Sequence, residues 1–321
     1  MRIHIQNPEN DPLFAITQSQ WDAAAARAGA AHAVTIADRE EAFAAALPTA
    51  EALIAPPSWL ARPFAAPRLG LIFCTTAGVD ALAPFTHLPP GAVLVCNRGI
   101  HGEKAGDYAI MALLMLAARM PALIASQAEQ RWEPRYTSPL SGRRLAVIGL
   151  GALGAAAAAR AGAFGMKVTG ITRTGAPHPA CHASLPVTAL DEALPAADFL
   201  LLACPLTPAT RNLIDRRRLS LLPPGAGLVN IGRGAVIDED ALADLLDAGR
   251  LGGAVLDVVA HEPLPPGHRL WRTSNLVLTP HVSADDPATY NPRTLDRFFA
   301  ALAALARGAA VPNVVDFARC Y

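Results

Sequence analysis

The feature that most constrains the fold of this chain is an apolar run that ends in three spaced glycines. The run is VIGLGALG, residues 147–154, with RLAVIG leading into it and the helix-forming stretch ALGAAAAARAGAF leading out. In such a strand–turn–helix, Gly149 permits the tight turn, Gly151 lets a pyrophosphate approach the backbone, and Gly154 lets the helix pack closely. The helix N-terminus offers N–H groups to the phosphate. The pattern predicts a dinucleotide site; a ligand-free packing turn and a methyltransferase-type loop are the alternatives.

Short apolar runs alternate with helical patterns along the whole chain, which is typical of parallel α/β sheets. In the first part we expect strands near 2–6, 33–36, 52–55, 70–74 and 93–96, with helices near 18–29, 39–46 and 103–120. After the polar stretch WEPRYTSPLSGRR we expect strands near 145–149, 167–171, 198–203, 227–231, 253–257 and 276–280, with helices near 152–163, 209–222 and 239–248. A last helix is expected from about 286, followed by VPNVVD, which returns to the first part.

Composition excludes several classes of protein. The chain has 321 residues, enough for two domains, and its 27 Lys and Arg balance 27 Asp and Glu, so no net charge attracts nucleic acid or a membrane. The five cysteines contain no C-x-x-C pair, which predicts a reducing cytoplasm and no metal site. The apolar run 109–118 is too short to span a bilayer. We therefore expect a cytoplasmic protein.

The strand after the glycine turn indicates which dinucleotide is preferred. A site that prefers NAD normally ends this strand with an acid that binds the ribose 2′-hydroxyl. In MKVTGITRTG the corresponding place holds Thr172, followed by Arg173 and Thr174. Arg173 offers a permanently charged, planar group to a 2′-phosphate. The stretch predicts NADP(H) as the preferred cofactor, with NAD(H) possible; the alternative is that Arg173 stacks on adenine or points to solvent.

Three later strands are each followed by a chemically useful side chain. Arg233 follows GLVNIG, Asp257 and Glu262 lie at the end of GAVL and in the loop after it, and His281 follows NLVLTP. Parallel strands bring these residues to the sheet edge that carries the glycine turn. Each could be an ordinary surface residue. Together, a His beside a carboxylate and an Arg form a general acid/base with an anion clamp, suited to protonating a carbonyl oxygen while a nicotinamide supplies hydride.

At this point the chain resembles the D-2-hydroxyacid dehydrogenase family. The resemblance lies in six ordered motifs: TTAGVD (75–80), VIGLGALG (147–154), CPLTPATRNLI (204–214), VNIGRGAVIDEDAL (229–242), LDVVAHEPLP (256–265) and LTPHVS (278–283). It implies that His281 protonates the 2-keto oxygen, that Glu262 orients the ring and keeps it cationic, and that Arg233 binds the keto and carboxylate oxygens. It also implies that the backbone N–H groups of Ala77 and Gly78 bind the substrate carboxylate.

The resemblance also implies a set of cofactor contacts. These residues are Gly149, Gly151, Ala152, Leu153, Gly154, Arg173, Thr174, Cys204, Pro205, Thr210, Ile231, Gly232 and Asp257. The segment 172–174 is similar to that of NADPH-preferring glyoxylate and hydroxypyruvate reductases, which points to small 2-keto acids as substrates. Two positions depart from the family pattern, Asp107 where Glu is common and Val259 where an aromatic residue is usual. Neither removes a proton-transfer group.

The implied architecture is α/β with two domains. A doubly wound, parallel-sheet Rossmann domain that binds NAD(P) is expected over 99–286, and a smaller flavodoxin-like substrate domain over 1–98 and 287–321. We expect the domains to close about the crossings near 98–103 and 283–290, and the family suggests a homodimer that uses the 120–142 extension. A dinucleotide-sensing scaffold or corepressor is the alternative function. A formate-dehydrogenase-like enzyme would be expected to have Gln at position 262.

Overall fold

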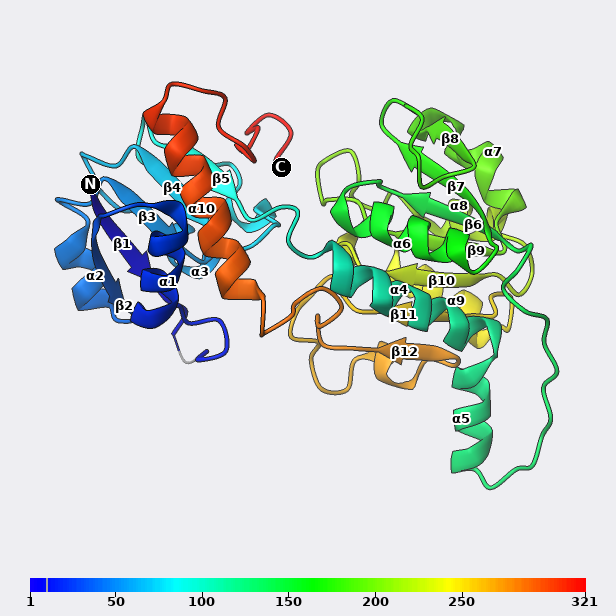
Figure 1. Cartoon of the computed structure of the whole chain (residues 1–321). Coiled ribbons are helices and arrows are strands. Elements are labelled where there is room, and N and C mark those ends of the chain that lie inside the picture. Colours follow the sequence, from blue (N-terminus) through cyan, green and yellow to red (C-terminus); the bar gives the residue numbers. More distant parts are fainter. Residues whose placement is uncertain (10) are drawn as a thin grey trace. The chain divides into compact units, whose positions relative to one another are not determined.

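The chain divides into two α/β units. The computed structural model describes residues 1–9 and 11–321. One unit contains residues 1–100 and 286–321, and the other contains residues 101–285 (Figure 1). Each unit is built on a parallel sheet with helices packed against it, so the predicted two-domain α/β fold class is confirmed.

The first unit has a five-stranded sheet in the order β2-β1-β3-β4-β5. This is the flavodoxin-like order that the fold prediction named. Its strands are β1 (Arg2–Gln6), β2 (Ala33–Ala37), β3 (Ala52–Ala55), β4 (Leu71–Cys74) and β5 (Val93–Cys96). Its helices are α1 (Gln18–Ala28), α2 (Glu40–Ala46), α3 (Pro57–Leu60) and α10 (Tyr290–Ala306).

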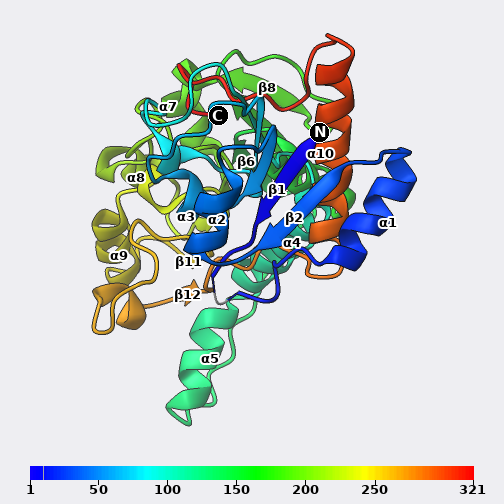
Figure 2. The ribbon, with the colours of Figure 1, turned by 90° about the vertical axis from the view of Figure 1, so that its left-hand side faces the viewer.

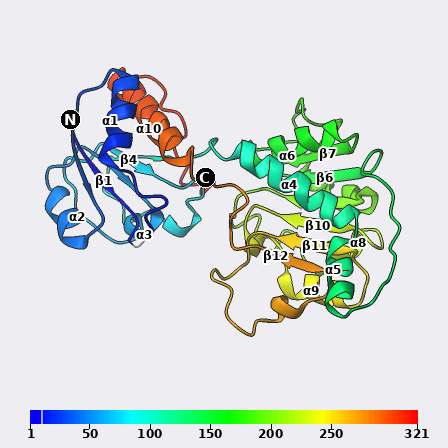
Figure 3. The same cartoon turned by 60° about the horizontal axis from the view of Figure 1, so that its bottom comes forward.

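Alternate residues of the central strand β3 enter two separate cores. Ile54 packs with side chains of α1 and α10, which lie side by side in Figure 3, and Leu53 packs on the other face with Phe43 of α2. Trp59 is buried, and its indole N–H donates to the Asn7 carbonyl at 3.0 Å. Trp59 therefore packs in the core of the first unit.

The second unit has a seven-stranded sheet in the order β12-β11-β10-β9-β6-β7-β8. Its strands are β6 (Arg144–Ile148), β7 (Lys167–Thr172), β8 (Ala183–Pro186), β9 (Phe199–Leu202), β10 (Gly227–Asn230), β11 (Gly253–Leu256) and β12 (Leu276–Leu278). Its helices are α4 (Gly102–Ala117), α5 (Met120–Ala128), α6 (Ala152–Ala163), α7 (Leu190–Ala193), α8 (Arg216–Leu221) and α9 (Glu239–Asp247). The order reverses direction at β6 and β9, the doubly wound arrangement expected of a Rossmann domain.

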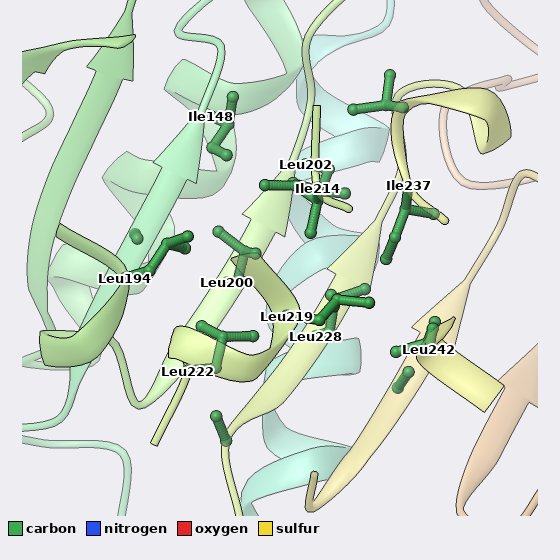
Figure 4. Packing of buried hydrophobic residues seen from close by; sticks show 14 of the residues in the cluster. Ile148, Leu194, Leu200, Leu202, Ile214, Leu219, Leu222, Leu228, Ile237 and Leu242 are labelled. Carbon is green, nitrogen blue, oxygen red and sulfur yellow. The ribbon is translucent and has the colours of Figure 1, made fainter. Parts of the chain in front are cut away.

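The two faces of this sheet carry different helices. Leu200 and Leu202 of β9 pack beneath α7, α8 and α9 with Leu219 and Leu222 (Figure 4). The intervening Leu201 faces α4 and α6 on the opposite side. Burial on both faces explains why these strands are nearly continuous apolar runs. Each fully buried leucine contributes about 1.5–3 kcal/mol relative to an exposed one.

Three details differ from the sequence prediction. The helix expected over 103–120 ends at Ala117; Arg119 has a left-handed φ of 56°, and α5 starts next to Pro121, which cannot donate within a continuing helix. The helix expected over 209–222 was wrong in its first part, because 207–213 form turns and α8 begins only after Asp215 caps it. The edge strand β8 was not predicted, since ASLP contains no apolar run.

The helices α4 and α5 bear on the membrane question. No single helix in residues 1–9 and 11–321 is long and apolar enough to cross a membrane, and only α4 and α5 taken together, bent by 63°, pass by length and composition. Most of one face of α4 is buried in the protein core. Figures 1 and 2 show α5 and the segment that follows it extending away from the sheet of the second unit.

Candidate active site

The glycine turn has the geometry that its sequence predicts. Gly149 has a left-handed φ of 91°, which explains the need for glycine there. A Cβ added at Gly154 would lie 1.8 Å from the Gly149 carbonyl oxygen, so the helix packs directly on the turn. At Gly151 an added Cβ would meet nothing within 4 Å, and no side chain caps the first turn of α6. The first N–H groups of α6, including those of Ala152 and Leu153, therefore remain available to a phosphate.

The ends of β9 and β10 meet beside this turn. Cys204 is buried, burial raises the pKa of its thiol to about 11, and a Cβ at Gly149 or Gly232 would collide with its backbone. Thr210 folds the next loop back by donating to the Pro205 carbonyl at 2.7 Å. The thiol is therefore a packing group, and the backbone of this loop borders the predicted nicotinamide side.

The Arg233 segment is shaped by Asn230, a residue that the sequence analysis did not single out. Its fully buried amide accepts from the Gly232 N–H and donates to the Arg233 carbonyl, each at 3.0 Å. Ile231, also among the predicted cofactor contacts, is buried next to it. The signal available in the sequence was an amide at the end of an apolar strand, followed by G-x-G. Asn230 thus fixes the turn from which the Arg233 side chain leaves.

Arg173 and Thr174 lie on a turn at the end of a strand. Both are exposed and directly follow β7, the neighbour of β6 in the sheet. The Thr172 hydroxyl accepts the Gly175 N–H at 2.9 Å and closes the turn that carries them. The cationic side chain and two hydroxyl residues at this strand end suit an anionic group beside the ribose.

His281 and Glu262 are directly paired. The imidazole Nδ1 lies 2.8 Å from Glu262 Oε2, while Glu262 Oε1 accepts the Val259 N–H at 3.1 Å. Hydrogen bonding to Glu262 raises the pKa of His281 above its ordinary value, against an opposing effect of burial. Burial alone would raise the pKa of Glu262, but the hydrogen bond and the charge of His281 bring it below its ordinary value. The pair is therefore charged over a wider pH range than its separate members.

Arg233 belongs to the same cluster. Its charge acts on both partners, favouring the carboxylate of Glu262 and disfavouring the cationic form of His281. A Cβ at Gly234 would lie 1.9 Å from the Val259 carbonyl carbon, so the arginine and glutamate segments are in backbone contact. A cation, a carboxylate and an imidazole that are far apart in the sequence are thus brought together on one unit.

Asp257 occupies a different environment from the one predicted. Its carboxylate is 1% exposed and accepts hydrogen bonds from the Thr279 hydroxyl at 2.6 Å and from the Val282 and Ser283 N–H groups, both at 2.9 Å. It therefore organises the backbone on either side of His281. Its predicted contact with the cofactor stays a prediction.

Ala77 and Gly78 lie in the other unit, in the loop after β4. Hydrogen bonds to the Thr75 carbonyl from Asn97 and Tyr290, and from the Thr76 hydroxyl to the Gly78 carbonyl, hold this loop. Within the described part of the chain no acceptor is found for the N–H groups of Ala77 and Gly78. Two such donors on a held loop suit a small anion.

The family model for the D-isomer specific 2-hydroxyacid dehydrogenase, NAD binding domain, matches residues 110–283. The chain belongs to this family. The expected resemblance is therefore confirmed.

Relatives within the family carry different names. The chain is 34% identical over 228 residues to glyoxylate/hydroxypyruvate reductase A of Arabidopsis thaliana, covering 70% of this chain and 72% of the relative. It is 32% identical over 254 residues to D-3-phosphoglycerate dehydrogenase of Mycobacterium tuberculosis, covering 78% of this chain. That match covers 48% of the relative, so the chain spans about half the length of such relatives.

A solved member of the family shows the same fold. The NADPH-dependent glyoxylate/hydroxypyruvate reductase of Sinorhizobium meliloti, in complex with NADP and sulfate, has a TM-score of 0.83 and 26% identity, covering 100% of this chain and 99% of that one.

Asp107, one of the two departures from the family pattern, forms an ion pair. Its carboxylate lies 2.7 Å from Arg160 Nε and joins α4 to α6.

Proposed function

We propose that the protein reduces a small 2-keto acid to the D-2-hydroxy acid, with NADPH as the preferred cofactor. The observation that carries the proposal is the His281–Glu262 pair with Arg233 beside it, at the same edge of the sheet as the glycine turn. An acid, its orienting carboxylate and a cation are what reduction of a carbonyl requires from the protein.

His281 acts as the general acid. With Nδ1 bonded to Glu262, the other ring nitrogen, Nε2, is the one that gives its proton to the keto oxygen. Glu262 orients the ring and, by raising the pKa of His281, keeps it protonated at higher pH than a solvated histidine. When bound, the nicotinamide cofactor would supply the hydride for this reduction.

Arg233 binds the oxygens of the substrate. The positive charge of Arg233 stabilises the negative charge that develops on the keto oxygen. The same charge disfavours the cationic form of His281, and the carboxylate of Glu262 offsets this effect. On the second unit, we assign the keto and carboxylate oxygens of the substrate to Arg233. For the first unit, we propose that the backbone N–H groups of Ala77 and Gly78 bind a carboxylate. The absence of a described acceptor for these two N–H groups supports that assignment.

The residues fit a phosphorylated dinucleotide. The open space above Gly151 and the uncapped N-terminus of α6 suit a pyrophosphate, and exposed Arg173 and Thr174 suit a 2′-phosphate. No carboxylate stands at Thr172 to repel it. The NADP bound to the Sinorhizobium meliloti reductase supports the same preference.

We propose glyoxylate or hydroxypyruvate as the substrate class. The names of the Arabidopsis thaliana and Sinorhizobium meliloti relatives support these small acids. A purely dinucleotide-sensing scaffold would not need His281, Glu262 and Arg233 together, and all three are present.

We also propose a homodimer. Large apolar side chains are exposed on α4, α5 and the segment after them, which together we call the α4–α5 surface: Met111, Leu114, Met120, Ile124, Trp132 and Tyr136. Trp132 and Tyr136 are 98% and 94% exposed, an unusual state for aromatic residues unless another surface covers them. A second copy of the chain offers the same apolar surface in return.

The test is a panel of 2-keto acids assayed with NADPH and, separately, with NADH. Glyoxylate or hydroxypyruvate should be turned over, faster with NADPH. His281→Ala should lower kcat roughly 100-fold or more, because it removes the general acid, and should leave NADPH affinity nearly unchanged. Arg173→Ala should raise the KM for NADPH about tenfold and change the KM for NADH little.

Each prediction of this test can be contradicted separately. Near-normal turnover by His281→Ala would overturn the proposed acid. Equal losses with both cofactors in Arg173→Ala would show that this side chain does not bind the 2′-phosphate. NADPH binding without turnover of any acid in the panel would favour the sensing scaffold.

A further inference from the structure

A chain of hydrogen bonds runs from helix α4 to the loop that carries His281. The Tyr108 hydroxyl lies 2.5 Å from the Thr279 hydroxyl, and Thr279 in turn donates to Asp257 at 2.6 Å. The two carboxylate oxygens of Asp257 accept the N–H groups of Val282 and Ser283. None of the sequence motifs includes Tyr108, which stands in α4 directly before the apolar run 109–118.

The loop needs such support because the backbone at His281 is strained. Its φ is 54°, a left-handed conformation that a residue with a side chain rarely adopts and that costs of the order of 1–3 kcal/mol. The His281 N–H points back to the carbonyls of Asp257 and Thr279, at 2.9 and 3.0 Å. This conformation lasts only when its surroundings hold the flanking residues in place.

The direction of the hydrogen bonds makes Tyr108 the first donor of the chain. Thr279 has one hydroxyl proton, which goes to Asp257, so the bond between the two hydroxyls requires the proton of Tyr108. Burial raises the pKa of Tyr108 to about 12, so this proton is present throughout the range of physiological pH. Tyr108 is 8% exposed and Asp257 is 1% exposed, which shields both groups from competing water.

We propose that Tyr108 is a positioning residue for catalysis: its hydroxyl, acting through Thr279 and Asp257, holds His281 in the backbone conformation that aims its ring at Glu262. The inference rests on the proposed function for its effect on turnover. Its effect on the loop itself does not depend on that function. Tyr108 hydrogen-bonds Thr279, and it acts through Thr279 and Asp257 rather than directly on Glu262 or the ring of His281.

Tyr108 is far in the sequence from the loop that carries His281. It lies in the first helix of the second unit, 149 residues before Asp257 in the chain, while Val282 and Ser283 lie just before that unit ends at Asp285. The hydrogen bonds from Tyr108 to Ser283 therefore link the first helix and the last loop of the second unit to the segment that carries His281. Besides Glu262, the charged groups that act on His281 are Arg233 and Asp257.

The experiment compares variants that remove single hydroxyl groups. Tyr108→Phe deletes only the first donor, and Thr279→Val deletes the middle one, whereas Thr279→Ser keeps a hydroxyl at that place. Tyr321→Phe, which deletes a hydroxyl in the other unit, is the matched control. Steady-state kinetics with NADPH and the best acid of the panel are measured against pH, together with amide hydrogen exchange and NMR titration of the histidines in the free protein.

We expect Tyr108→Phe to lower kcat roughly tenfold with little change in the KM for NADPH, because misplacing a reacting group slows the chemical step. The pKa of His281 should fall toward its ordinary value, and the N–H groups of Val282 and Ser283 should exchange faster. Thr279→Ser, which keeps the hydroxyl, should leave kcat, the pKa of His281 and the amide exchange at their wild-type values. The double variant Tyr108→Phe, Thr279→Val should be no worse than Thr279→Val alone, since the two hydroxyl groups belong to one chain.

Two results would overturn the inference. One is an unchanged His281 pKa and unchanged amide exchange in Tyr108→Phe; the other is additive losses in the double variant. A wild-type protein that reduces no acid in the panel would refute the proposed function instead, and the titration and exchange measurements, which need no substrate, would still decide whether Tyr108 holds the loop.

Discussion

At the scale of single residues, the proposed chemistry depends on how His281 is held. The side chains of His281 and Glu262 are 44% and 37% exposed, so solvent screens their attraction and the pair adds little to folding stability. Its effect is to set the orientation and the protonation state of the ring. Because Glu262 raises the pKa of His281, the acid form persists to higher pH, and the rate of keto-acid reduction should fall only above that raised pKa.

Glu262→Gln should therefore move the falling limb of the kcat/KM–pH profile for reduction to lower pH. The amide can still hydrogen-bond the ring but carries no charge, so the pKa of His281 returns toward its ordinary value of 6.5. The measurement is the pH profile with saturating NADPH, and Glu41→Gln on exposed α2 serves as the control. An unshifted limb in Glu262→Gln would show that the group that titrates is not His281.

At the scale of elements, the strand–turn–helix unit β6–α6 gives two glycines of one helix opposite roles. Gly154 faces the Gly149 carbonyl oxygen so closely that a side chain has no room, whereas a Cβ at Gly162 would meet nothing within 4 Å. Both lie in α6. Helix propensity alone would rank alanine above glycine at both positions.

We expect the two alanine substitutions to change stability in opposite directions. Gly154→Ala should lower the free energy of unfolding by about 1–3 kcal/mol, because the turn must open to admit the methyl group, and should weaken NADPH binding. Gly162→Ala should raise it by about 0.5–1 kcal/mol, since it only removes backbone freedom from the unfolded chain. Chemical denaturation followed by circular dichroism measures both. A stable Gly154→Ala variant with normal NADPH affinity would contradict the close packing.

At the scale of the whole molecule, the α4–α5 surface gathers six exposed large apolar side chains. It begins on the exposed side of α4, whose other side packs against the sheet, and continues onto α5, which extends away from the unit (Figure 1). Hydrophobic side chains on a projecting element stabilise a protein only when a partner covers them.

Replacing Ile124 and Trp132 with Asp should convert the proposed dimer to a monomer, because two unpaired charges would be buried at its centre. Sedimentation velocity measures the change, and Leu13→Asp, an exposed apolar position in the other unit, is the control that should leave the dimer intact. A wild-type protein that sediments as a monomer would remove the dimer proposal.

Much of this protein was predictable from local sequence. Strand and helix positions follow from hydrophobic periodicity, which is a property of neighbouring residues, and the glycine spacing identified the turn between β6 and α6. Arg233, Glu262 and His281 could be singled out as candidates because each directly follows a recognisable strand, or lies in the loop after one. The resemblance to the family could be recognised for the same reason, because each of its six motifs is a continuous stretch of sequence.

The sequence by itself determined the fold class and indicated His281, Glu262 and Arg233 as the proposed acid, its carboxylate and the arginine. Only the tertiary structure decided how these groups are held. Asn230, Asp257 and Tyr108 act through hydrogen bonds to residues brought near by folding, and in an apolar helix a tyrosine has no local pattern that marks its hydroxyl as functional. The break before α5 and the short α8 likewise depend on backbone conformations at Arg119 and Asn212, which no periodicity encodes.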